Sequence, residues 1–191
     1  MNELIIQAFE ESIAAKRSFL DKNLDALVKV VELIAQTFSN GQKLLIFGNG
    51  GSAADAQHIA AEFVNRFRIE RPPLPALALT TDTSAITSIA NDYDYKEIFA
   101  KQVRALGKEG DLALAISTSG NAANVLAAVE ACKQLKITTV GLTGGSGGKL
   151  AKATDYLLCV SDSNSTARIQ ETHILAAHVI CELVDRTLFP S

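Results

Sequence analysis

A histidine and a glutamate stand four residues apart in the first half of the chain, at His58 and Glu62. Residues at this spacing lie about 40° apart around a helix axis and share one face. An imidazole nitrogen and a carboxylate oxygen on one face could chelate a zinc ion, with bonds of about 2.0–2.2 Å. The pair could equally form a simple hydrogen bond on a helix surface, and the spacing alone favours that arrangement. His58 and Glu62 are therefore a candidate site that needs support from other residues.

Two segments rich in glycine, serine and threonine each lie between an apolar run and a helical pattern. They consist of Gly48, Asn49, Gly50, Gly51 and Ser52, and of Ser117, Thr118, Ser119, Gly120 and Asn121. The first N–H groups of a helix lack partners and its dipole favours negative charge, so such junctions bind anions. Glycine also lets a ligand approach the backbone closely. Tight turns and helix caps have a similar composition, so one such loop alone would not decide the matter.

Two features that these loops lack limit the kind of anion that they could bind. Gly48-x-Gly50-x-x-Ala53 nearly matches a dinucleotide fingerprint, but no acidic residue ends the following strand about 20 residues later, and Asp82 comes about thirty residues on. The lysine of a nucleotide-triphosphate loop is also missing. A Ser-Thr-Ser loop without lysine therefore favours a sugar monophosphate.

The elements that must position these side chains alternate along the chain. Apolar runs predict strands at residues 43–47, 74–79, 112–116, 138–142 and 156–160. Helical patterns cover about 52–66, a segment ending near 135, a short piece after 148, and about 166–188. Residues 1–38 also have a helical apolar stripe, which we expect to break into two helices at residues 21–23 and to end at Asn40-Gly41.

Short, fully apolar strands separated by helices predict a parallel sheet covered on both faces. The expected fold class is α/β, a three-layer αβα sandwich around a parallel five-stranded sheet, with added N-terminal helices. No linker or repeat divides the 191 residues. We expect one domain, with N-terminal helices at 1–40 and the α/β core at 41–191.

The overall composition limits the partners and the compartment. The formal net charge is −3, with 20% charged residues, which gives no general reason to bind nucleic acid or an anionic membrane. No apolar run reaches the ~20 residues of a membrane span. The three cysteines lie in apolar stretches without metal-type spacing, which is typical of reduced core residues. We expect a cytoplasmic protein.

The two loops resemble the signature loops of the sugar isomerase (SIS) fold, which is flavodoxin-like. The segment from His58 to Glu62, the run from Arg168 to His173, and His178 are similar to the phosphoheptose isomerase family, and the resemblance covers essentially the whole chain. Members of that family convert sedoheptulose 7-phosphate to D-glycero-D-manno-heptose 7-phosphate. This is the first step towards ADP- or GDP-heptose and heptose-containing bacterial glycans such as lipopolysaccharide. The resemblance also implies a homotetramer with active sites near subunit interfaces.

The resemblance implies a role for individual residues. Glu62 and His178 match the acid/base pair, and one zinc ion per subunit would be held by His58, Glu62, Gln170 and His178. Substrate-contacting positions correspond to Asn49, Gly50, Gly51, Ser52, Glu62, Asn91, Asp92, Ser117, Thr118, Ser119 and Gln170. The family commonly has a further serine where this chain has Ala122, so one hydrogen bond to the phosphate is expected to be missing.

The spacing of the expected ligands on the last helix suggests how the site is assembled. Gln170 and His178 are about 80° apart around that helix and ~12 Å apart along it, which is awkward for one metal ion. We therefore expect the site to be completed across a subunit interface. His173 lies about 140° from His178 and is interpreted as a structural histidine.

Two other functions share this fold. Residues 89–92, 100–107 and 187–190 are similar to a replication-initiator-associating protein, which would be a non-catalytic role. That protein, by the same resemblance, lacks counterparts of Glu62 and His178, which this chain keeps. A sugar-phosphate-sensing regulator would carry a DNA-binding domain, for which the acidic N-terminal helices are unsuited. The isomerase is therefore the favoured function.

Overall fold

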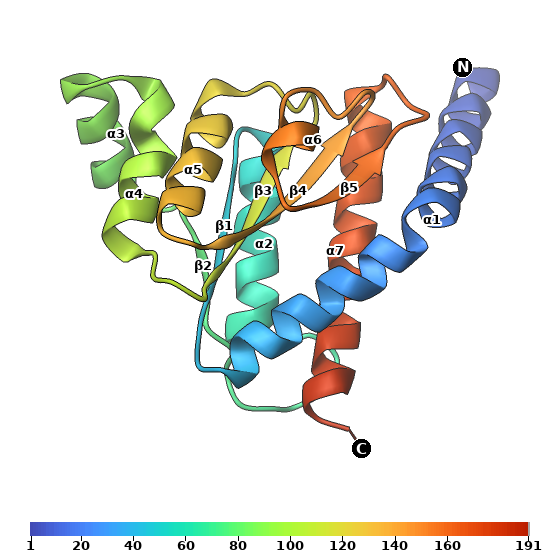
Figure 1. Ribbon diagram of the computed structural model, residues 1–191. Helices are drawn as coiled ribbons and strands as arrows, with labels where there is room; N and C mark the ends of the chain where they lie inside the picture. Colours follow the sequence, from blue (N-terminus) through green and yellow to red (C-terminus); the bar gives the residue numbers. More distant parts are fainter. Residues whose placement is uncertain (191) are drawn as a thin grey trace.

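Five parallel strands form the centre of the molecule (Figure 1), a computed structural model that describes residues 1–190. The order across the sheet is β2-β1-β3-β4-β5. The strands are β1 (Leu44–Gly48), β2 (Ala76–Ala78), β3 (Leu112–Ser117), β4 (Thr138–Gly144) and β5 (Tyr156–Val160). All residues of β1 and β3 are buried, as expected for central strands of a sheet covered on both sides. The predicted parallel five-stranded sheet is confirmed.

Helices cover both faces of this sheet and make three layers. On one face lie α1 (Asn2–Ser39), α2 (Gly51–Val64) and α7 (Thr166–Leu188), and on the other α4 (Ile98–Leu106), α5 (Ala123–Gln134) and the short α6 (Leu150–Ala153). Helix α3 (Thr83–Asp92) and the 3-10 turn η1 (Tyr95–Glu97) pack beside α4 and α5. Alternate residues of β1 serve the two cores, since Leu44 and Ile46 face α1, α2 and α7 whereas Leu45 and Phe47 face α4 and α5. The predicted sandwich is thereby confirmed.

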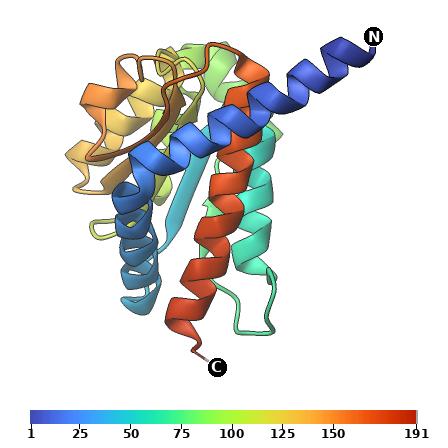
Figure 2. The same ribbon diagram turned by 90° about the vertical axis from the view of Figure 1, so that its right-hand side faces the viewer.

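The N-terminal region forms one helix, so the predicted break at residues 21–23 is wrong. Helix α1 is continuous over 38 residues, although it changes direction along its length (Figure 2). Asn23, which suggested the break, is buried, and its side chain forms hydrogen bonds with β5 and with the preceding turn of α1. Its amide accepts a hydrogen bond from the Cys159 N–H at 3.0 Å and donates to the Phe19 carbonyl at 2.8 Å and the Cys159 carbonyl at 3.2 Å. Asn23 thus satisfies backbone groups of the edge strand β5, which offsets its weak helix propensity.

Helix α1 carries exposed apolar side chains, most of them in its N-terminal half, among them Leu4, Ile5, Ile6, Phe9, Ile13, Leu20 and Leu24. We call this set the α1 stripe. None of the helices within residues 1–190 combines the length and the apolar character that crossing a bilayer would need.

The helices between β2 and β3 were not predicted from the sequence. Helix α3 contains several serine and threonine residues, which have weak helix propensity. Its start is fixed by Asp82, whose carboxylate accepts a hydrogen bond from the Ala85 N–H at 2.9 Å. Helices α3 and α4 then place Tyr95 of η1 against Asn49, with its hydroxyl 3.4 Å from the Asn49 amide oxygen.

Candidate functional site

Three side chains that can donate protons or bind a metal meet between α2 and α7. His58 and Glu62 lie on α2 and His178 on α7, and their ligand atoms all lie within 4.8 Å of one another. The His58 and His178 Nε2 atoms are 2.8 Å apart, and His58 Nε2 is 3.3 Å from Glu62 Oε1. We call these residues the His–Glu–His cluster. The sequence placed all three among its candidates, and the packing of α2 against α7 brings them together.

The ring of His178 is held from two sides. The His58 ring meets it edge to face, with centroids 5.1 Å apart, and the Phe67 ring stacks on it at 5.3 Å with an angle of 21° between the planes. Phe67, just beyond the end of α2, was not among the predicted site residues. An aromatic side chain five residues after Glu62 gives no sequence signal of its own. Its contact with His178 limits how the imidazole can turn.

The chemistry of the cluster fits a divalent metal such as zinc. Two imidazole nitrogens and one carboxylate oxygen match the donor set of many catalytic zinc sites, which leave a fourth position open. The two Nε2 atoms, at 2.8 Å, are somewhat closer than the ~3.3 Å of two nitrogens on one tetrahedral ion. A small outward movement of the His58 side chain, which is 45% exposed, would accommodate the ion.

Gln170, the fourth expected ligand, lies elsewhere on α7. A Cβ atom placed on Gly51 would collide with the Gln170 amide, so this side chain covers the start of α2. Gly51 and His58 are seven residues apart, or about 10 Å along the helix. Within one chain, Gln170 therefore lies with the first glycine-rich loop rather than with the His–Glu–His cluster. With any larger residue at position 51, the Gln170 amide would have to move.

The two glycine- and serine-rich loops meet at the centre of the sheet's carboxyl edge. Gly48 of β1 pairs with Ile116 of β3. After β1 the chain continues to β2 on one side of this pair, and after β3 it continues to β4 on the other side. Open α/β sheets bind their ligands at such a switch point. A reciprocal pair of amides joins the first loop to the start of α5, which follows the second loop, because Asn49 and Asn124 each donate to the other at 2.8 Å.

The second loop leaves several donors open. Ser117 is buried at the end of β3, Thr118 is partly buried and Ser119 is exposed. Ala122 takes the N-cap position of α5 in extended conformation and offers no side-chain hydrogen bond to the helix. Thr118 and Ser119 also line a cavity of about 210 Å³ beside the loops that follow β4 and β5. This arrangement suits a small anion with an attached polar chain.

Two expected substrate residues lie apart from the cluster. Asn91 and Asp92 are exposed at the end of α3, where the Asn91 amide donates to Asp92 at 2.9 Å. They stand a few residues before Tyr95, which contacts Asn49. Their substrate contacts stay a prediction.

Two titratable residues near the site have shifted pKa values. Burial raises the pKa of Asp55, one turn before His58, and the nearby His58 lowers it in part; one Asp55 oxygen is buried without a hydrogen-bond partner. The sequence reading missed Asp55, although its spacing of three from His58 could have revealed it. Burial lowers the pKa of His173 to about 4, opposed by its hydrogen bond to the Thr143 carbonyl. His173 is 1% exposed and serves the core, as predicted.

Comparison with known proteins agrees with this geometry. The SIS domain family matches residues 8–144. The phosphoheptose isomerase of Roseiflexus sp. (strain RS-1) is 56% identical over 185 residues, which cover 97% of this chain and 93% of that protein. The chain belongs to the phosphoheptose isomerase family of the SIS fold. Among solved phosphoheptose isomerases, the one from Neisseria gonorrhoeae is 47% identical, with a TM-score of 0.91 over 96% of this chain and 98% of that one. The one from Francisella tularensis is 42% identical, with a TM-score of 0.93 over 96% and 97%.

Proposed function

We propose that this phosphoheptose isomerase family member converts sedoheptulose 7-phosphate to D-glycero-D-manno-heptose 7-phosphate. The observation that carries the proposal is the His–Glu–His cluster, in which a carboxylate and two imidazoles converge between two rigid helices. A protein that only binds a replication initiator would not need these groups in contact. The product would feed heptose-containing glycans such as lipopolysaccharide.

The reaction moves two protons, and the cluster can account for both. Glu62 removes the proton from the carbon beside the ketose carbonyl, which gives an enediol, and returns a proton to the neighbouring carbon. His178 transfers a proton between the two oxygens of the enediol, since an imidazole can donate and accept. Phe67 and His58 hold its ring in place for that transfer.

The phosphate is proposed to bind at the two loops. Ser117, Thr118 and Ser119 supply hydroxyl donors, and Asn49, Gly50, Gly51 and Ser52 supply the start of α2. Gln170, Asn91 and Asp92 are proposed to contact the sugar. Binding of the phosphate at the start of α2 would direct the sugar along the helix towards Glu62, about three turns further on.

We further propose one zinc ion per subunit, held by His58, Glu62 and His178. When bound, zinc would polarise the substrate carbonyl and stabilise negative charge on the enediolate oxygen. Gln170 of a neighbouring copy is proposed as the fourth ligand, because this chain's own Gln170 lies against Gly51. The α1 stripe is the proposed subunit interface of a homotetramer. We also propose that each subunit is a single domain and that the protein acts in the cytoplasm.

The test is to incubate the purified protein with sedoheptulose 7-phosphate and zinc and to follow formation of the aldose. Glu62→Gln should lower kcat by at least about 1000-fold with the fold intact, since it removes the base. Glu130→Gln, the same change at an exposed position of α5, is the matched control. Residual activity of Glu62→Gln near that of the control would refute the assignment. Absence of turnover in the unmodified protein, with saturable binding of a replication initiator, would favour the non-catalytic role.

A further inference from the structure

Arg71 lies in the segment between α2 and β2 and is buried, with its side chain 1% exposed. A buried guanidinium must have hydrogen-bond partners, because an unpaired one would cost several kcal/mol. Its neighbours Pro72 and Pro73 stiffen the backbone here and favour an extended conformation at Arg71. The position of this side chain is therefore well defined.

The guanidinium of Arg71 caps the end of α2. Its Nη2 donates to the Glu62 carbonyl at 2.8 Å, and its Nη1 donates to the carbonyls of Phe63 at 2.7 Å and Asn65 at 3.2 Å. The last carbonyls of a helix lack partners within the helix and carry its negative dipole end, so a cation here is doubly favourable. One of the residues it holds is Glu62, the proposed base.

The same side chain joins α2 to α7. Arg71 Nε donates to Asp185 Oδ1 at 2.9 Å, and Asp185 is 3% exposed. Asp185 lies seven residues after His178, which is two turns further along nearly the same face of α7. One guanidinium thus contacts the helix that bears Glu62 and the helix that bears His178.

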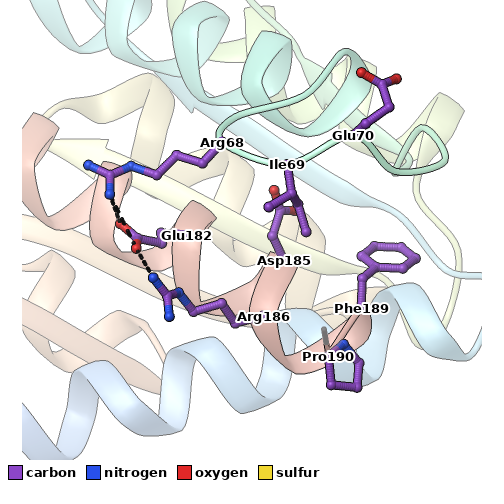
Figure 3. A pocket seen from close by; sticks show the side chains of 8 residues that line it. All are labelled: Arg68, Ile69, Glu70, Glu182, Asp185, Arg186, Phe189 and Pro190. Carbon is purple, nitrogen blue, oxygen red and sulfur yellow. Dashed lines mark hydrogen bonds and ion pairs between the residues drawn. The ribbon is translucent and has the colours of Figure 1, made fainter.

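The other polar contacts at this end of the two helices are weaker. A surface pocket of about 640 Å³ separates residues 68–70 from the end of α7, so apolar packing is incomplete there (Figure 3). Glu182 bridges Arg68 and Arg186 at the mouth of this pocket, but both arginines are about two-thirds exposed. Exposed ion pairs contribute about 0–1 kcal/mol, whereas loss of one partner of a buried pair costs about 3–5 kcal/mol. The Arg71–Asp185 pair is therefore the strongest polar link at this end of the two helices, beside the apolar core to which Phe63 and Val184 belong.

We propose that Arg71 is a positioning residue for the isomerisation: it sets the separation of Glu62 and His178 by tying the last turn of α2 to α7 through Asp185. The inference rests on the proposed acid–base roles of those two residues. Arg71 itself touches neither substrate nor the reacting atoms. Because the phosphate loops lie at the opposite end of α2, its effect should fall on kcat and not on KM.

The experiment compares variants of Arg71 with a matched ion pair elsewhere. Lys43 and Asp111 also form a pair with a buried carboxylate, at 2.5 Å, and the hydrogen bonds of this pair involve no residue of the cluster. Arg71→Met should lower kcat about 10- to 100-fold with KM changed less than about 2-fold, since small misplacements of reacting groups have effects of this size. Lys43→Met should lower the melting temperature but leave kcat per folded molecule within about 2-fold.

Two conservative variants separate positioning from stability. Arg71→Lys keeps the charge beside Asp185 but cannot reach the three carbonyls together, so it should regain stability while kcat stays low. Asp185→Asn keeps the cap on α2 and weakens the link to α7, so kcat should also fall. Wild-type kcat per folded molecule in Arg71→Lys and Asp185→Asn would overturn the proposal, even if Arg71→Met does not fold. If Glu62→Gln stays active, the acid–base assignment fails instead. If Glu62→Gln is inactive while Arg71→Lys and Asp185→Asn keep the wild-type kcat, only the positioning role of Arg71 fails.

Discussion

The Nε2 atoms of His58 and His178 lie 2.8 Å apart, although 120 positions separate the two residues in the sequence. An N···N contact of this length requires one ring to donate and the other to accept, so the pair shares one proton. A metal ion bound by both rings would displace that proton. The cluster can thus exist as a hydrogen-bonded pair or as a metal site.

Removing either histidine should weaken zinc binding. His58→Ala and His178→Ala each remove one of the three ligands that this chain supplies, and we expect zinc affinity to fall more than about 100-fold, beyond the effect of losing an outer-shell partner. Calorimetric titration would measure the affinity and the proton released on binding. Glu130→Gln is the control, and unchanged affinity in both histidine variants would exclude the proposed ligands.

The buried His173 should make stability fall in mild acid. Its pKa is about 4 in the folded protein and 6.5 for the free side chain, so between these values the unfolded state takes up a proton that the folded state does not. The neutral ring's contribution is complete above pH 6.5 and is lost as the pH falls to 4, about 3 kcal/mol in all. Urea unfolding at several pH values should show this loss relative to His173→Gln, which keeps a donor for the Thr143 carbonyl. Parallel pH dependence of the two proteins would contradict the prediction.

A serine at position 122 should improve phosphate binding. Ala122 already has the extended backbone of an N-cap residue, so Ala122→Ser can cap α5 or donate to a phosphate without rearrangement. We expect KM to fall about 5-fold, which corresponds to about 1 kcal/mol for one added hydrogen bond, with kcat unchanged. Steady-state kinetics would measure this. Ala105→Ser, on an exposed face of α4, should leave KM as it is.

Asn23 should stabilise the edge of the sheet. Asn23→Ala would leave the N–H and carbonyl of Cys159 without their partner, at a cost of about 2 kcal/mol that alanine's better helix propensity offsets only in part. Hydrogen exchange at the Cys159 amide should become faster, and the melting temperature should fall. Asp21→Ala, two residues earlier and exposed, should change neither.

The α1 stripe should hold the subunits together. Phe9 is 68% exposed, and Phe9→Glu would place a charge within the proposed interface. Light scattering should show a smaller assembly with helical content unchanged. Glu10→Gln, at the neighbouring exposed position, should keep the original mass; a monomeric wild-type protein would refute the proposed tetramer.

The sequence predicted those parts of the structure that depend on local pattern. The apolar runs located all five strands because a buried parallel strand has few polar residues, and the loops around Gly50 and Thr118 were visible from their composition. Asn23 misled the prediction because its role depends on Cys159, more than a hundred residues away. Helix α3 was missed since packing and the Asp82 cap outweigh its weak propensity. The meeting of His58 with His178 depends on how α2 packs against α7, which no local pattern specifies.

The reciprocal amide pair of Asn49 and Asn124 has a consequence for how a ligand enters. Each amide donates one N–H to the oxygen of the other, so the first loop is coupled to the start of α5, after the second loop, without any ligand between them. Binding of a sugar phosphate should therefore require little ordering of these loops, because the binding site is already formed. If the segment that bears Asn49 or Asn124 were replaced by that of a distant relative, the partner position would need the relative's residue as well.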